Sequence, residues 1–214
     1  MHSNKSDYTH FLHKYDYRRR LPEADLMDFI GGDLSKLLEA GASAIEEMGE
    51  YLVTRSPLDQ IFIQVFEFRR NGEFEPGEFV WDNKTRNEAE DPPQLCYYRV
   101  LQSDSGQYPL SNEDYWQLLP SDPRSTIIRD FAVDIALYRL TPANSPVEIM
   151  NQFRQFYDDA IAWCKVYMKN NRPTNLPQKP PENRGIIIKG GSSRRSRRKH
   201  NNSDNDSSNR YDGW

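Results

Sequence analysis

Residues 122–170 read DPRSTIIRDFAVDIALYRLTPANSPVEIMNQFRQFYDDAIAWCKVYMKN, and this stretch predicts two long helices with a short break between them. Asp122 is a typical N-cap, and Pro123 suits the first helical position because no helical hydrogen bond is needed there. The apolar residues that follow recur at steps of three and four, so they share one face of the helix. They are Ile127, Ile128, Phe131, Ile135 and Tyr138. Pro142 ends this helix.

The second helix begins at the sequence SPVE, in which Ser145 and Glu148 form a capping box and Pro146 takes the first helical position. Its apolar face repeats with the same spacing to about Asn170 and comprises Met150, Phe153, Tyr157, Ile161, Cys164 and Met168. Both helices are therefore expected to bury one face in a common core.

Helical segments also precede this stretch. Residues 22–30 start at a proline and stop at Gly31, a residue suited to the end of a helix. Asp33 can cap a second, short segment. A longer helix is expected over residues 40–55, where apolar side chains again share one face, and Pro57 ends it.

Between the helices, residues 61–120 change pattern. Short runs such as IFIQVFEF, EFVW and QLCYYRVLQ are separated by turn residues, which indicates a β-ribbon or small antiparallel sheet. Its aromatic residues are expected to form a small core of their own, with stacking on a sugar as the alternative. They are Trp81, Tyr97, Tyr98, Tyr108, Tyr115 and Trp116. The predicted fold is mainly α: a bundle of about four helices with this β insert and a long, extended C-terminal arm.

Composition divides the chain further. Hydrophobic residues make up 36% of the 214 residues, which predicts one folded domain with flexible ends. We expect a flexible N-terminal arm over 1–20, a helical domain over 21–170 and an extended, basic, partly disordered arm over 171–214. The arm has ten Lys and Arg against four Asp and Glu, a net charge of +6. The rest has 18 bases and 28 acids, a net charge of −10.

The arm holds the residues predicted to bind a partner. Ile186, Ile187 and Ile188 lie between glycines, and such a β-prone run can add a strand to the sheet edge of another protein. Docking on the chain's own β insert is the alternative. A basic cluster and a terminal aromatic pair follow, namely Arg194, Arg195, Arg197, Arg198, Lys199, Tyr211 and Trp214. The cluster could contact an acidic protein surface or nucleic acid, or only keep the tail soluble.

Signals of catalysis are sparse. All four histidines, His2, His10, His13 and His200, lie in the predicted flexible ends, so the predicted domain lacks a histidine to activate a nucleophile. The chain contains no phosphate-binding loop, zinc-protease helix or dinucleotide motif. We therefore expect neither an enzyme nor a bound cofactor or metal.

Asp134 lies beside the apolar face of its helix, where a carboxylate needs a partner because an unpaired buried charge is unfavourable. Arg55, near the end of an earlier predicted helix, is the candidate partner. Exposure of Asp134 on the flank of its helix is the alternative.

The spacing of two segments resembles a family of Mu-like phage proteins of unknown function. AIEEMGEYLVTRSPLDQIF resembles that family's first signature helix, and IIRDFAVDIALYRL with FRQFYDDAIAWCKVYMKNNRPTNLP resembles its second half. The resemblance covers roughly residues 20–60 and 120–178. Ser56, Phe156 and Cys164 depart from the family pattern. The matching residues are Tyr51, Leu52, Arg55, Asp134, Ile135, Ala136, Tyr138, Leu140, Arg154, Tyr157, Asp158, Ala160, Ile161, Trp163, Leu176 and Pro177.

This resemblance implies a head–tail connector, or adaptor, of a tailed bacteriophage. Such a subunit would form a ring, expected to be twelvefold, below the portal protein and would dock the next tail or stopper component. DNA would pass through the ring without specific binding, which suits an acidic body. The protein would be made in the host bacterial cytoplasm and end in the virion. No apolar run is long enough for a membrane span.

Two other functions fit parts of the sequence. The first is a nucleic-acid-binding regulator that uses the basic C-terminal tail. The second is a sugar-binding tail module built on the aromatic β insert.

Overall fold

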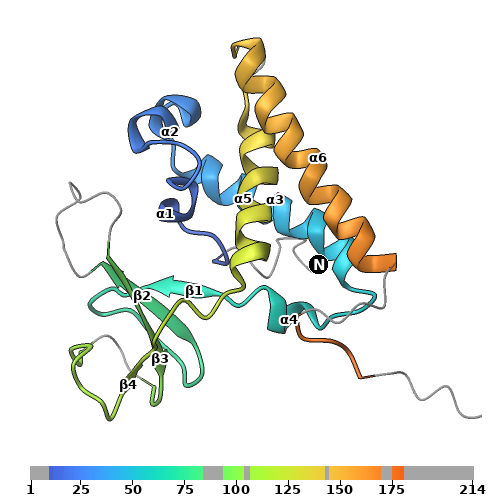
Figure 1. The fold of residues 1–214 in the computed structure, drawn as a ribbon. Helices are drawn as coiled ribbons and strands as arrows, with labels where there is room; N and C mark the ends of the chain where they lie inside the picture. The colour runs from blue at the N-terminus through green and yellow to red at the C-terminus, as the bar shows by residue number, and fades with distance from the viewer. Residues whose placement is uncertain (1–9, 84–93, 104–106, 143–144, 170–174, 181–214) are drawn as a thin grey trace, which may run out of the picture. The chain divides into compact units, whose positions relative to one another are not determined.

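The computed structural model describes residues 10–83, 94–103, 107–142, 145–169 and 175–180. The predictions for Ile186–Ile188, the basic cluster, Tyr211 and Trp214 lie outside these residues. The described part contains six helices and four strands (Figure 1). They are α1 (Lys14–Tyr17), α2 (Glu23–Ile30), α3 (Ser35–Leu52), α4 (Leu58–Ile61), β1 (Val65–Glu67), β2 (Phe79–Asn83), β3 (Leu95–Val100), β4 (Trp116–Leu118), α5 (Thr126–Leu140) and α6 (Val147–Lys169).

The fold is mixed α/β, so the prediction of a mainly α bundle with a β-ribbon or small antiparallel sheet is wrong. The strands form one four-stranded sheet in the order β1-β2-β3-β4. β1 pairs with β2 in parallel, whereas β2 with β3 and β3 with β4 are antiparallel. The sheet was expected to be antiparallel throughout, but the eleven residues from Phe68 to Glu78 carry the chain back so that β2 starts in the same direction as β1.

The helical core is built by α3, α5 and α6, which pack against one another (Figure 1). The apolar faces predicted for the last two helices are largely confirmed, because Ile128, Ile135, Phe153, Ile161 and Cys164 are buried in one cluster. Ile127, Tyr138 and Met168, which were assigned to the same faces, are partly exposed. The buried apolar face of each of these two helices is therefore narrower than the spacing of its apolar residues suggested.

α3 runs without a break where the sequence suggested two segments. The N-cap residue is Leu34, which makes no side-chain capping bond, whereas the carboxylate of the preceding Asp33 accepts the Ser35 backbone N–H at 3.0 Å. The glycine inside the helix, Gly41, faces the N-terminal segment: a Cβ there would lie 3.0 Å from the Tyr17 hydroxyl. A larger residue at position 41 would therefore crowd the Tyr17 hydroxyl, which explains why glycine is accommodated inside this helix despite its low helix propensity.

Helix ends follow the sequence only in part, since α3 ends at Leu52 and not at Arg55. Gly31 is left-handed, with φ of 63°, and ends α2 as predicted. α5, however, begins at Thr126 and not at Pro123. Asp122 does not cap the helix, because its carboxylate binds the backbone and side chain of Arg124. Those three residues form a turn before the helix.

The prediction that residues 1–20 form a flexible arm is wrong for residues 10–20. Phe11, Leu12 and Tyr17 are buried in the helical core, and the Tyr17 hydroxyl donates to the Leu37 carbonyl at 2.9 Å. His10 and His13 therefore belong to the folded part of the chain. Residues 1–9 lie outside the described residues.

The aromatic residues of the sheet form two small clusters, which confirms the expectation of a core separate from the helices. One cluster gathers around Val80, Tyr98 and Trp116 on one side of the sheet. The other contains Trp81 and Tyr97, whose side chains point to the opposite side. This second cluster faces the N-terminal segment, where the Trp81 ring lies 4.9 Å from the His13 ring.

Candidate functional site: the Arg124 cluster

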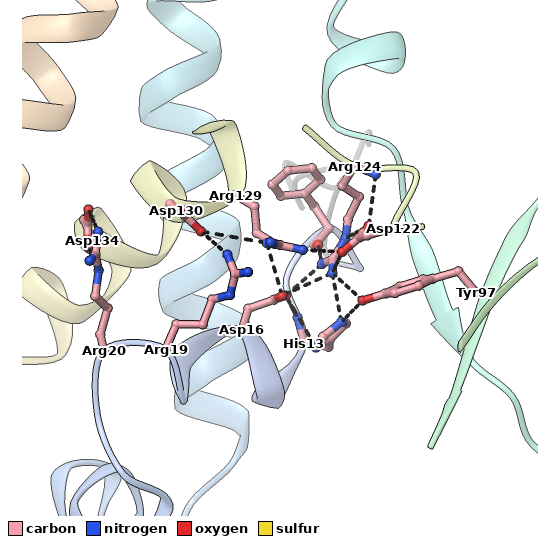
Figure 2. Close-up of polar contacts among 11 residues, drawn as sticks. His13, Asp16, Arg19, Arg20, Tyr97, Asp122, Arg124, Arg129, Asp130 and Asp134 are labelled. Atoms are coloured by element: carbon pink, nitrogen blue, oxygen red, sulfur yellow. Dashed lines mark hydrogen bonds and ion pairs between the residues drawn. The ribbon is translucent and has the colours of Figure 1, made fainter. Parts of the chain in front are cut away.

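Arg124 is the centre of a buried group of charged side chains that joins three parts of the chain (Figure 2). Its side chain is 0% exposed and lies between Asp16 of α1 and Asp122 of its own turn. Arg124 Nη1 is 2.7 Å from Asp16 Oδ2, and Nη2 is 2.7 Å from Asp122 Oδ2. The guanidinium also donates to the Phe11 carbonyl. A buried arginine with two carboxylates and further acceptors uses the several donors of its fork.

His13 and Tyr97 connect this group to the sheet. His13 Nε2 lies 2.9 Å from Arg124 Nη2 and 3.3 Å from the Tyr97 hydroxyl, and Arg124 Nη2 donates to the same hydroxyl at 3.2 Å. The His13 backbone N–H donates to Asp16 at 2.9 Å. Burial lowers the pKa of His13 to about 4, with Asp16 opposing the shift and Arg124 reinforcing it. His13 is therefore neutral at pH 7 and accepts through Nε2.

Arg129, one turn into α5, supplies the second positive charge. It forms an ion pair with Asp122 and lies 3.6 Å from Asp16. Two arginines thus face two aspartates, so the buried charges balance. Burial raises the pKa of Asp122, but the hydrogen bonds and charges of Arg124 and Arg129 outweigh burial and lower the pKa to about 2.

Two more arginine–aspartate ion pairs lie between the N-terminal segment and α5, beyond the Arg124 cluster (Figure 2). Arg19 meets Asp130 at 2.8 Å, and Arg20 meets Asp134 through two hydrogen bonds of 2.7 and 2.9 Å. Burial raises the pKa of Asp134, and Arg20 opposes that shift. The N-terminal segment is thus held to α5 by a row of arginine–aspartate contacts.

The predicted pair of Arg55 with Asp134 is wrong, although Asp134 is buried and paired as expected. Arg55 Nη1 donates to the Tyr167 carbonyl at 2.6 Å, near the end of α6. The Arg55 carbonyl accepts the Lys179 backbone N–H at 2.8 Å. Arg55 therefore ties the end of α3 to α6 and to the described residues that follow it. The true partner, Arg20, was overlooked because it lies in the segment expected to be flexible.

The contacts of the Arg124 cluster are those of a structural network that connects the N-terminal segment, the sheet and α5. The ring of His13 is buried, and its Nε2 already contacts Arg124 and Tyr97. Burial also raises the pKa of Tyr97, which keeps its hydroxyl protonated. Within the described residues, no group of His, Cys, Asp and Glu could hold a metal ion, and Cys96 and Cys164 are free thiols.

Sequence reasoning missed this cluster entirely. Arg124 and Asp122 were assigned to the start of a helix, and Asp16 and His13 to a flexible arm. One signal was present in the sequence: the apolar pair Phe11-Leu12 lies next to His13 and is followed by Tyr15 and Tyr17, a pattern that favours burial.

Comparisons of the chain with protein-family models, curated proteins and solved structures gave no match. None of the helices in the described ranges is both long and apolar enough to span a membrane.

Proposed function

We propose that the protein is a structural assembly subunit, a head–tail connector of a tailed bacteriophage that forms a ring below the portal protein. The observation that carries the structural role is the Arg124 cluster, in which buried ionisable groups bind one another and hold the N-terminal segment, sheet and α5 together. Structural ion-pair networks shift pKa values as catalytic sites do, so the shifted pKa values of His13 and Asp122 are compatible with a structural role.

The virion role rests on sequence. The resemblance of residues 20–60 and 120–178 to the Mu-like phage family implies a connector, and the charge distribution is compatible with that role. Residues 1–170 carry a net charge of −10, which suits a ring that lets DNA pass without holding it. Residues 171–214 carry +6, which suits attachment to an acidic neighbour such as a portal or stopper protein.

Negative-stain electron microscopy of the purified full-length protein at high concentration tests this proposal. A connector subunit gives closed rings of about twelve copies, or a collar at the head–tail junction when virions are examined. Serine in place of Ile186, Ile187 and Ile188 should leave the folded domain intact and abolish attachment to the portal, if these residues add a strand to it. A protein that stays monomeric at every concentration contradicts the ring.

A nucleic-acid-binding regulator remains the competing function, because the run SRRSRRKH concentrates five positive charges. A gel-shift titration distinguishes the two. A regulator binds DNA through this run and loses binding when Arg194, Arg195, Arg197 and Arg198 become serine. A connector shows no measurable DNA affinity at moderate salt, with or without these substitutions, because its acidic body displaces few counterions from DNA.

A further inference from the structure

A cavity of about 470 Å³ lies among the N-terminal segment, the start of α3 and the β1 side of the sheet. Its lining is mostly apolar, with Leu34 and Leu38 from the helix side and Phe66, Phe74 and Trp81 from the sheet side. An apolar cavity of about 150 Å³ is enough to bind benzene, so this one has room for a molecule of roughly two or three rings. Its volume is also typical of small-molecule sites.

Aromatic rings form the sheet side of this cavity. The rings of His10 and Phe66 lie 4.8 Å apart, and the Trp81 ring lies 4.9 Å from the ring of His13. All four residues line the cavity. A flat aromatic molecule contacts such rings in offset or edge-to-face arrangements, which stabilise the complex beyond the burial of apolar surface. An aromatic ligand is therefore favoured over an aliphatic one.

The buried polar side chains at the cavity already have partners. His13 Nε2 contacts Arg124 and the Tyr97 hydroxyl, and the Tyr17 hydroxyl donates to the Leu37 carbonyl at 2.9 Å. Burial lowers the pKa of His13 and raises the pKa of Tyr17, so both are neutral at pH 7. Neither residue brings a charge to the cavity.

The charged side chains that line the cavity are engaged as well. Arg69 Nη2 lies 2.9 Å from Glu67 Oε2, and Lys14 has an interaction partner of its own. Burial and the charge of Arg69 lower the pKa of His10, which is therefore neutral at pH 7. A charged ligand would lose its water here without meeting an unpaired opposite charge among the lining residues, which is unfavourable. The ligand that fits is therefore uncharged.

Two leucines at the cavity are exposed. Leu34 is 48% exposed and Leu38 is 49% exposed, and the two lie one helical turn apart. Large aliphatic side chains that border an apolar cavity extend it into one continuous patch, which is typical of a binding site and not of scattered surface leucines.

We propose that this cavity binds an uncharged, flat aromatic small molecule of that size. The ligand packs between the leucines at the start of α3 and the rings of Phe66 and Trp81, and its affinity comes from the apolar surface that it buries. Because it binds the folded chain, it also stabilises the fold. Such a site goes beyond the ring proposed above, which requires no ligand.

N-phenyl-1-naphthylamine, an uncharged dye that becomes fluorescent in apolar surroundings, tests the proposal on the full-length protein. We expect saturable binding of one dye per chain. Naphthalene-2-carboxamide should displace it at least about tenfold better than naphthalene-2-carboxylate or 2-naphthylmethylammonium, which have the same rings but carry a charge. The carboxamide should also raise the melting temperature. A lack of saturable binding, or equal or better displacement by either ion, would overturn the proposal.

Matched variants locate the site. Leu38→Asp and Leu34→Asp each place a charge in the apolar wall, so dye binding should weaken at least about tenfold. Both positions are exposed, and aspartate suits the N-cap position that Leu34 occupies, so urea denaturation should show an intact fold. Leu118→Asp is the control, because Leu118 is 56% exposed but lies on β4, at the other edge of the sheet. Undiminished binding in both wall variants, or an equal loss in the control, would contradict the proposed site.

Discussion

Arg124 and Arg20 both join the N-terminal segment to the region of α5, but water reaches them differently. The Arg124 side chain is fully buried and meets Asp16, Asp122, His13 and Tyr97. The Arg20 side chain is 36% exposed and meets Asp134, whose side chain is 4% exposed. Around Arg124, the arginine–aspartate contacts belong to a buried network with several members. At Arg20, the same kind of contact is a single, partly solvated pair. The contribution of each arginine to the free energy of unfolding therefore depends on its partners and its burial more than on its residue type.

The largest effect is expected for Arg124→Met. This change leaves Asp16 and Asp122 buried with only Arg129 to compensate them, so the free energy of unfolding should fall by about 3–5 kcal/mol. Urea denaturation followed by circular dichroism measures the loss. Arg19→Met is the control, because the Arg19–Asp130 pair is largely exposed and should lose less than about 1 kcal/mol. A similar, small loss in both variants would mean that the network adds little.

A pH titration sharpens the comparison, because only the Arg124 cluster contains a histidine. Unfolded His13 titrates near its ordinary value of 6.5, whereas folded His13 remains neutral down to about pH 4. The unfolded chain thus binds more protons in this window, so stability should fall as the pH drops from 6.5 to 4, by up to about 3 kcal/mol. Asp122, with a pKa of about 2, adds its loss only at lower pH.

His13→Gln tests this assignment, because glutamine can accept from Arg124 but does not titrate. Urea midpoints at pH 7, 5.5 and 4 should converge in the variant and separate in the parent protein. An unchanged slope in the variant would assign the acid sensitivity to another group.

A smaller loss of unfolding free energy is expected when Asp134 is replaced. Because Arg20 is partly solvated, Asp134→Ala should lower the free energy of unfolding by about 2 kcal/mol, less than the loss at Arg124. A double-mutant cycle should give a coupling of about 1 kcal/mol between Asp134 and Arg20 and close to zero between Asp134 and Arg55. Coupling to Arg55 instead would restore the partner that the sequence suggested.

The helices were predictable because their signals are local. The apolar spacing of α6 and the glycine after α2 can be read from a few neighbouring residues, and Phe153, Ile161 and Gly31 behave as expected. The positions of the strands were predictable for the same reason. Their directions were not, since the parallel pairing of β1 with β2 depends on the path of the chain between them.

The Arg124 cluster could not be predicted because it depends on contacts between distant residues. Arg124 and Asp16 are 108 positions apart, and each is a residue type that is usually exposed. Only the folded chain shows that their charges neutralise each other. Asp134 illustrates the intermediate case: its position on the helix predicted burial and a partner, whereas the identity of Arg20 depended on the tertiary structure.

The central claim, that the Arg124 cluster unites sheet and helices in one cooperative body, is tested most directly by native-state hydrogen exchange. Mass spectrometry would compare amide protection in β3, which carries Tyr97, with that in α5, which carries Arg129. We expect both elements to open with the same free energy, within about 1 kcal/mol, and to separate in the Arg124→Met variant. A β3 strand that already opens about 3 kcal/mol more easily than α5 in the parent protein would contradict the claim.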